Sequence, residues 1–159
     1  MKSLILICFL TAFLLQDKID DNYFYEVFSS DSIEKIESLL EKYEKISNPN
    51  SVLNVYKGAL YIKKSSYLSS PGDRVDSFII GKALLENEIN NYPDNVEYRF
   101  IRLILQEQTP PVLRYKSNIK EDKEMIINSF GSAGIILKQR IVDYSNNSLI
   151  LDFNEFENK

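Results

Sequence analysis

The hydrophobic positions of this chain recur mainly with the period of an α-helix. The pattern is clearest over residues 33–46, where Ile, Leu and Tyr return every three or four positions and Glu and Lys fill the other face. The same period predicts further helices over residues 51–67, 73–92, 96–108, 118–130 and 135–144. A short first helix is expected within residues 19–28, and residues 149–156 are expected to form either a short last helix or a frayed tail. No sustained two-residue alternation is present, so we expect no sheet.

Helix-capping and helix-breaking residues separate these segments. Glu34 follows Asp31 by three positions, which predicts a capping box that begins at Asp31. Pro110 and Pro111 end the helix over 96–108, because a proline cannot donate a hydrogen bond to a continuing helix. Helices of this length joined by short turns pack as antiparallel neighbours. We therefore expect an all-α fold of about six helices, arranged as stacked hairpins or as a bundle.

Small and large residues are spaced in a way that favours stacked hairpins. Gly58 is followed by Tyr61 in one helix, Gly81 by Leu85 in the next, and Pro93 comes eight residues later. This order resembles the tetratricopeptide repeat, in which small residues allow two helices to approach closely and a large residue fills the space between them. The interval from Tyr61 to Gly81 is longer than the 34-residue repeat allows, so one degenerate repeat is visible rather than an array.

A longer set of positions extends this comparison. It comprises Tyr56-Lys57-Gly58-Ala59, Gly81-Lys82-x-Leu84-Leu85, the run Pro93-x-Asn95-x-Glu97-x-Arg99-x-x-Arg102-Leu103-x-x-Gln106-Glu107-x-x-Pro110, and Asn118-Ile119-x-x-Asp122-Lys123. In this order the positions resemble a family of uncharacterised exported tetratricopeptide-like helical proteins from flavobacteria and related Bacteroidetes. The resemblance covers residues 51–126 and is most specific between Arg99 and Pro110. It implies a fold and a compartment but no reaction.

Residues 1–16 have the features of a signal peptide. Lys2 precedes an apolar run from Leu4 to Leu15, which has the length of a signal-peptide core and is too short to span a bilayer comfortably. We expect this signal peptide to be cleaved, with Ala12 and the bond before Gln16 as the candidate positions. The remaining chain would be a periplasmic or secreted helical domain over residues 17–145, followed by a short helix or flexible acidic tail over residues 146–159.

Composition narrows the chemistry that the domain could perform. The chain has no histidine and one cysteine, Cys8, which would be lost with the signal peptide. Lipid anchoring at Cys8 is disfavoured because the apolar run continues seven residues beyond it. The formal net charge is −4 and the Lys and Arg residues are scattered, which argues against nucleic acid and against an anionic membrane surface as partners. We expect no metal site, no cofactor, no catalytic residues and no transmembrane helix in the mature chain.

The helix over 96–108 carries the candidate ligand-binding residues Arg99, Arg102, Gln106 and Glu107. The first three are spaced three and four positions apart and therefore share one helix face, where two arginines could grip a carboxylate or a phosphate. The other interpretation is structural: Arg99 and Arg102 would pair with carboxylates such as Glu97, Glu107 or Glu121 and tie this helix to its neighbours.

Other candidate chemistry is weaker. No acid lies on an apolar face, where its pKa would rise, so a glycoside hydrolase is not expected. Tyr56, Tyr61, Tyr92 and Tyr98 could line an aromatic groove, but such tyrosines are more often core residues with the hydroxyl directed to water. We therefore expect a non-enzymatic adaptor or binding module that presents a surface to a protein or peptide. The alternative is an anionic small-ligand protein or enzyme that uses the face of Arg99 and Arg102.

Overall fold

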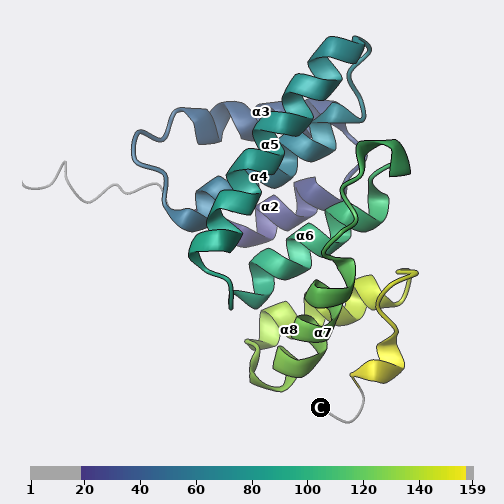
Figure 1. Cartoon of the computed structure of the whole chain (residues 1–159). Helices are drawn as coiled ribbons and strands as arrows, with labels where there is room; N and C mark the ends of the chain where they lie inside the picture. The colour runs from purple at the N-terminus through teal and green to yellow at the C-terminus, as the bar shows by residue number, and fades with distance from the viewer. Residues whose placement is uncertain (1–18, 157–159) are drawn as a thin grey trace, which may run out of the picture.

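The computed structural model describes residues 19–156, and within that range the chain forms helices and no strand (Figure 1). The α-helices are α2 (Asp21–Ser29), α3 (Ile33–Glu44), α4 (Ser51–Ser65), α5 (Pro71–Asn91), α6 (Val96–Gln108), α7 (Ile119–Ser129) and α8 (Ile135–Ser145). Short 3₁₀ helices are η2 (Pro111–Leu113), η3 (Phe130–Ser132) and η4 (Phe153–Glu155). The expected all-α fold is confirmed, and α2 is the short first helix. The expected signal peptide over residues 1–16 lies outside the described residues.

Polar residues cap the helices at most of the predicted breaks. The Asn50 side chain accepts a hydrogen bond from the Leu53 amide at 2.9 Å and begins α4. Asn95 caps α6 in the same way, and Pro71 occupies the first position of α5, where no amide proton is needed. Because each cap satisfies an otherwise free amide, the turns are fixed by local chemistry.

The start of α3 differs from the expected capping box. Ser32 is the N-cap, and its hydroxyl accepts a hydrogen bond from the Lys35 amide at 3.2 Å. The carboxylate of Asp31 instead accepts a hydrogen bond from the Tyr67 hydroxyl at 3.2 Å. The predicted capping box was therefore wrong: the N-cap lies one position later, and the third helical residue is Lys35 rather than a Glu or Gln.

Helices α4 and α5 cross in close contact at two glycines, as the sequence predicted. A Cβ atom at Gly81 would lie 2.5 Å from the Gly58 carbonyl oxygen, and one at Gly58 would lie 2.8 Å from the Gly81 carbonyl oxygen. Leu85, one turn after Gly81, is fully buried. Any side chain at either glycine would force the two backbones apart, so the crossing requires glycine on both helices.

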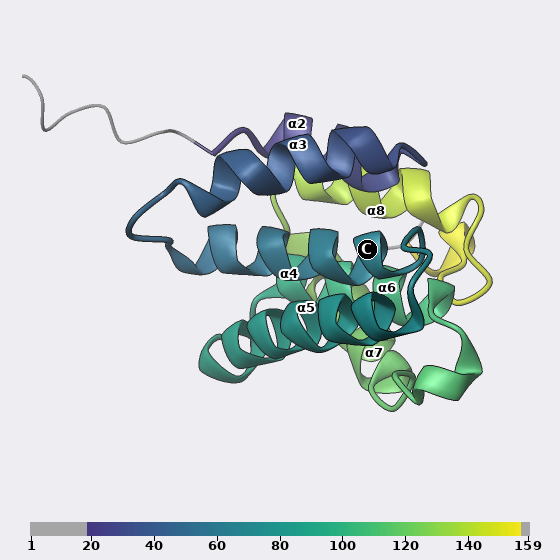
Figure 2. The ribbon, with the colours of Figure 1, turned by 90° about the horizontal axis from the view of Figure 1, so that it is seen from above.

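Helix α6 lies at the centre of the molecule. Seen from above, α2, α3 and α8 lie along one edge, α5 and α7 lie along the opposite edge, and α4 and α6 run between them (Figure 2). Every residue of α6 from Tyr98 to Gln106 is buried. The face that carries Arg99 and Arg102 is therefore as enclosed as the apolar face, and its charges need partners inside the protein.

The residues after α8 fold back onto the core. Leu151 and Phe156 are buried, and the Phe156 ring lies 4.7 Å from that of Phe130 between centroids. Lys123 of α7 forms an ion pair with Glu155 at 2.9 Å. The segment over residues 149–156, which was expected to be a short helix or a frayed tail, thus contains the 3₁₀ helix η4 and packs against the core as far as residue 156.

Among the helices of residues 19–156, none is long and apolar enough to cross a membrane.

Candidate functional site

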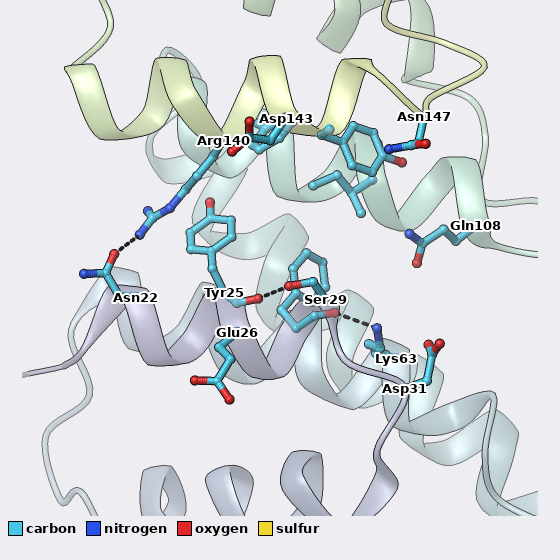
Figure 3. A pocket seen from close by; sticks show the side chains of 14 residues that line it. Asn22, Tyr25, Glu26, Ser29, Asp31, Lys63, Gln108, Arg140, Asp143 and Asn147 are labelled. Atoms are coloured by element: carbon cyan, nitrogen blue, oxygen red, sulfur yellow. Dashed lines mark hydrogen bonds between the residues drawn. The ribbon is translucent and has the colours of Figure 1, made fainter.

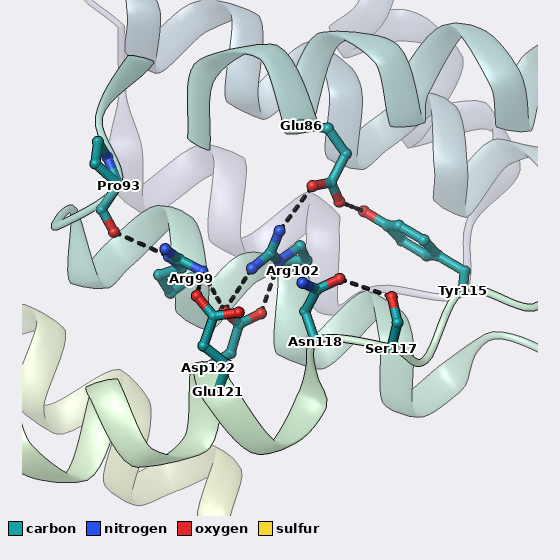
Figure 4. Close-up of polar contacts among 9 residues, drawn as sticks. All are labelled: Glu86, Pro93, Arg99, Arg102, Tyr115, Ser117, Asn118, Glu121 and Asp122. Atoms are coloured by element: carbon teal, nitrogen blue, oxygen red, sulfur yellow. Dashed lines mark hydrogen bonds and ion pairs between the residues drawn. The ribbon is translucent and has the colours of Figure 1, made fainter. Parts of the chain in front are cut away.

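The two predicted arginines lie in a buried ion-pair cluster between α5, α6 and α7 (Figure 4). Asp122 of α7 is completely buried and takes two hydrogen bonds from Arg102, at 2.7 Å from Nε and 2.6 Å from Nη2. The remaining Arg102 nitrogen, Nη1, donates to Glu86 of α5 at 2.7 Å. Such a two-pronged contact with a carboxylate is the strongest geometry that a guanidinium group can adopt. Arg102 therefore connects three helices.

Arg99 completes the cluster at its outer edge. Its Nη1 atom donates to Asp122 at 3.0 Å and to Glu121 at 2.7 Å, and its Nε atom donates to the Pro93 carbonyl oxygen at 3.0 Å. The hydrogen bond from Arg99 lowers the pKa of Glu121 below its usual value. Tyr115 donates to Glu86 at 2.6 Å, and burial together with the charge of Glu86 raises the pKa of its phenol. Every guanidinium group in the cluster thus has carboxylate partners within the protein.

Gln106 and Glu107 do not join the arginines in one site. Gln106 is completely buried, and among the described residues neither polar atom of its side chain has a hydrogen-bond partner. The Glu107 carboxylate points to the C-terminal segment, where it accepts from Tyr144 at 2.9 Å, Ser148 at 2.7 Å and the Leu149 amide at 2.6 Å. Glu107 therefore anchors the end of α8 to α6. Three acids were expected as partners of the arginines. Glu121 is correct, whereas Glu107 binds the C-terminal segment and Glu97 binds Tyr25 and Tyr56.

A groove of about 600 Å³ lies on the opposite side of α6 from the arginine cluster, between α2 and α8 (Figure 3). Its apolar lining, here called its floor, consists of the buried residues Phe100 and Ile104 of α6, one turn apart, and Phe28. The lining positions on α2 recur three and four residues apart from Asn22 to Ser29, and the same spacing on α8 runs into the following turn. Three helices thus each present one regular face to the same hollow.

The rest of the lining is polar or aromatic. Asn22, Gln108 and Asn147 bring side-chain amides to its walls, and Tyr25 and Tyr144 bring phenol rings. Amides both donate and accept hydrogen bonds, as does the backbone of a peptide. The groove therefore combines an apolar floor with adaptable hydrogen-bonding groups, which is the usual composition of a binding pocket.

Arg140 of α8 holds one end of the groove together. Its guanidinium group lies 3.9 Å above the centre of the Tyr25 ring and donates to the Asn22 side chain at 2.8 Å. The Tyr25 hydroxyl donates to Glu97 at 3.0 Å, and Glu97 lies 3.7 Å from Arg140. Burial and then the charge of Glu97 raise the pKa of Tyr25 well above its usual value, so this phenol stays protonated and acts as a donor.

Sequence reasoning did not find the groove. Tyr56 and Tyr98 are buried, as core tyrosines would be, and neither they nor Tyr61 and Tyr92 line the groove. The signal was present on α2 and α8, where polar and aromatic residues share one face. That face is indistinguishable from a solvated helix face until the fold brings the two helices together.

Within residues 19–156 no group of three or more acids, histidines or cysteines could hold a metal ion.

Comparison with protein-family models, with curated proteins and with solved structures finds no match to this chain. The resemblance to exported flavobacterial proteins and to the tetratricopeptide repeat therefore stays a prediction, and the candidate site is argued from its own geometry.

Proposed function

We propose that this protein is an exported, non-enzymatic binding module whose groove between α2 and α8 holds a short segment of a peptide or protein. The observation that carries the proposal is the convergence of three helix faces on one hollow with an apolar floor and amide-bearing walls. Hollows of this size that join apolar surface to a few polar groups are the usual binding sites of helical proteins.

The size of the groove favours a short extended segment. The lining residues of α2 from Asn22 to Ser29 span about 10 Å along the helix axis, from a rise of about 1.5 Å per residue. An extended peptide advances about 3.3 Å per residue, so about three residues fit between the ends of the groove. Apolar side chains of the segment would contact Phe28, Phe100 and Ile104, and its backbone would contact the side-chain amides of the lining.

The titratable groups of the groove favour binding over catalysis. Burial raises the pKa of Tyr144 above its usual value, as it does that of Tyr25, so both phenols are weaker acids than usual. The chain has no histidine, and the raised pKa values move both phenols further from the neutral range in which general acids and bases act.

The arginine cluster gives less support to the anionic-ligand alternative. Arg99 and Arg102 have side chains that are only 10% and 3% exposed, and both are bound by internal carboxylates. An added anion would have to displace Asp122 or Glu86 from buried ion pairs, which is costly.

A library of random hexapeptides tests the proposal. We expect the purified chain to enrich a set of peptides that the variant Ser29→Trp does not, because the indole would fill the groove beside the floor residues. Ser38→Trp places the same bulk on an exposed position of α3 outside the groove and is the matched control. Enrichment that is equal in all three proteins, or absent from all three, would refute groove binding.

Export is tested separately. The mass of the N-terminus of the protein recovered from its native envelope should show the loss of 12 to 16 residues, whereas a retained Met1 would refute the proposed compartment.

A further inference from the structure

We infer that the groove selects a cationic segment, one that carries lysine or arginine next to an apolar residue. The inference rests on the proposed function and specifies the chemistry of its ligand. It follows from the charged residues of the groove: the cations are bound by other groups of the protein, whereas the acids face solvent.

Both cations of the groove are occupied by internal partners. Arg140 stacks on Tyr25 and donates to Asn22, as described above. The Lys63 ammonium donates to the Phe28 carbonyl oxygen at 2.5 Å and lies 5.8 Å from the centre of the Phe28 ring. This carbonyl is near the C-terminus of α2, where the helix dipole favours a cation. Burial lowers the pKa of Lys63, which agrees with an ammonium group turned towards the protein. Both cations therefore already have partners within the protein.

The three acids of the groove, in contrast, are exposed and weakly engaged. Among the described residues, Glu26 forms its ion pair with Lys35, and the two side chains are 60% and 49% exposed. Asp143 accepts from Gln139 at 2.8 Å, and Asp31 accepts from Tyr67 at 3.2 Å, both on the surface. The charge of Asp31 also acts to raise the pKa of Lys63, against the larger effect of burial. These acids come from α2, from α8 and from the turn between α2 and α3. A segment in the groove would therefore meet carboxylates on more than one side.

The distribution of charge discriminates between ligands. Exposed ion pairs are weak and exchangeable, so a ligand cation can replace Lys35 or water beside these acids at little cost. An anionic ligand would meet the same acids without access to the two occupied cations. The formal net charge of −4 over the chain adds to the attraction of a cation at long range.

The test compares charge variants in the same hexapeptide selection. We expect peptides enriched by the wild-type chain to carry net positive charge, and their affinity to fall as salt is added. The double variant Glu26→Gln/Asp143→Asn should bind those peptides about tenfold more weakly at low ionic strength. Asp76→Asn/Glu124→Gln removes two exposed acids outside the groove and should bind as wild type does.

The outcomes separate the inference from the proposed function. Neutral or acidic peptides that are enriched by wild type and lost in Ser29→Trp would overturn the charge selectivity and leave groove binding intact. Equal loss of affinity in both charge variants would show a general effect of net charge and would also overturn the inference. No enrichment over Ser29→Trp would overturn both.

Discussion

Asp122 is the residue whose removal tests the arginine cluster most directly. It is completely buried, and it accepts three hydrogen bonds from the guanidinium groups of Arg99 and Arg102. Asp122→Ala would leave Arg102 with Glu86 and Arg99 with the exposed Glu121, and the buried guanidinium nitrogens that donate to Asp122 would lose their acceptor. Removing one partner of a buried ion pair costs about 3–5 kcal/mol. We expect that loss in the free energy of unfolding.

Urea unfolding measures this loss. For a domain with an m-value of about 2 kcal/mol/M, the midpoint should fall by about 2 M. Glu121→Ala is the matched control, because Glu121 pairs with the same arginine but is 60% exposed, and exposed pairs contribute about 1 kcal/mol or less. The double variant Arg102→Met/Asp122→Leu should regain most of the stability, since apolar residues can replace a buried pair. If Asp122→Ala unfolds within about 1 kcal/mol of wild type, the cluster is not structural, and its arginines become the first place to search for an anionic ligand.

Three further predictions follow from the core. Gly81→Ala should lower the free energy of unfolding by about 1–3 kcal/mol, whereas Gly72→Ala in the same helix, where a Cβ meets only the Ser70 hydroxyl at 3.8 Å, should be neutral or slightly stabilising; equal effects in urea melts would contradict the close crossing. Gln106→Met should stabilise the protein by about 1–2 kcal/mol, because it removes an amide that is buried without a hydrogen-bond partner among the described residues; a less stable variant would show that the amide is satisfied. Burial and neighbouring carboxylates raise the pKa of Tyr25 and Tyr56 in the folded protein, so the unfolded chain loses these protons first. Stability should therefore be constant below about pH 10 and fall above it by up to about 1.4 kcal/mol per pH unit for each tyrosine; urea melts that do not change up to about pH 11 would refute the burial of these phenols.

The all-α fold could be predicted from the sequence because its helices are specified by local sequence patterns. Helical period, caps such as Asn50 and Asn95, and the pairing of Gly58 with Gly81 are each readable within one or two turns of chain. The capping box predicted at Asp31 failed because the adjacent Ser32 caps α3, while the Asp31 carboxylate accepts a hydrogen bond from Tyr67, 36 positions away. Local patterns predict local structure, and contacts from distant segments can override them.

The sites were harder to predict because they join distant residues. The common face of Arg99 and Arg102 follows from helical spacing, and Glu121 was among the expected partners. Asp122, the central acid of the cluster, could not be ranked above its many acidic neighbours without knowledge of the rotation of α7 against α6. The groove was still harder to predict, because the hydrogen bond between Asn22 and Arg140 at its end joins residues 118 positions apart. No periodicity within α2 or α8 reveals that the two helices face each other.

The glycine crossing also has a consequence for the order in which the chain assembles. Helices α4 and α5 are adjacent in sequence, so bringing them together closes a short loop at small entropic cost. We expect this hairpin to form early and to be the region most protected from amide hydrogen exchange. The groove closes only when α8 reaches α2, after nearly all of the chain has been ordered. Amides of α8 should therefore exchange fastest among the helices, and a bound peptide should slow them selectively, because it would connect the last helix to the first described one.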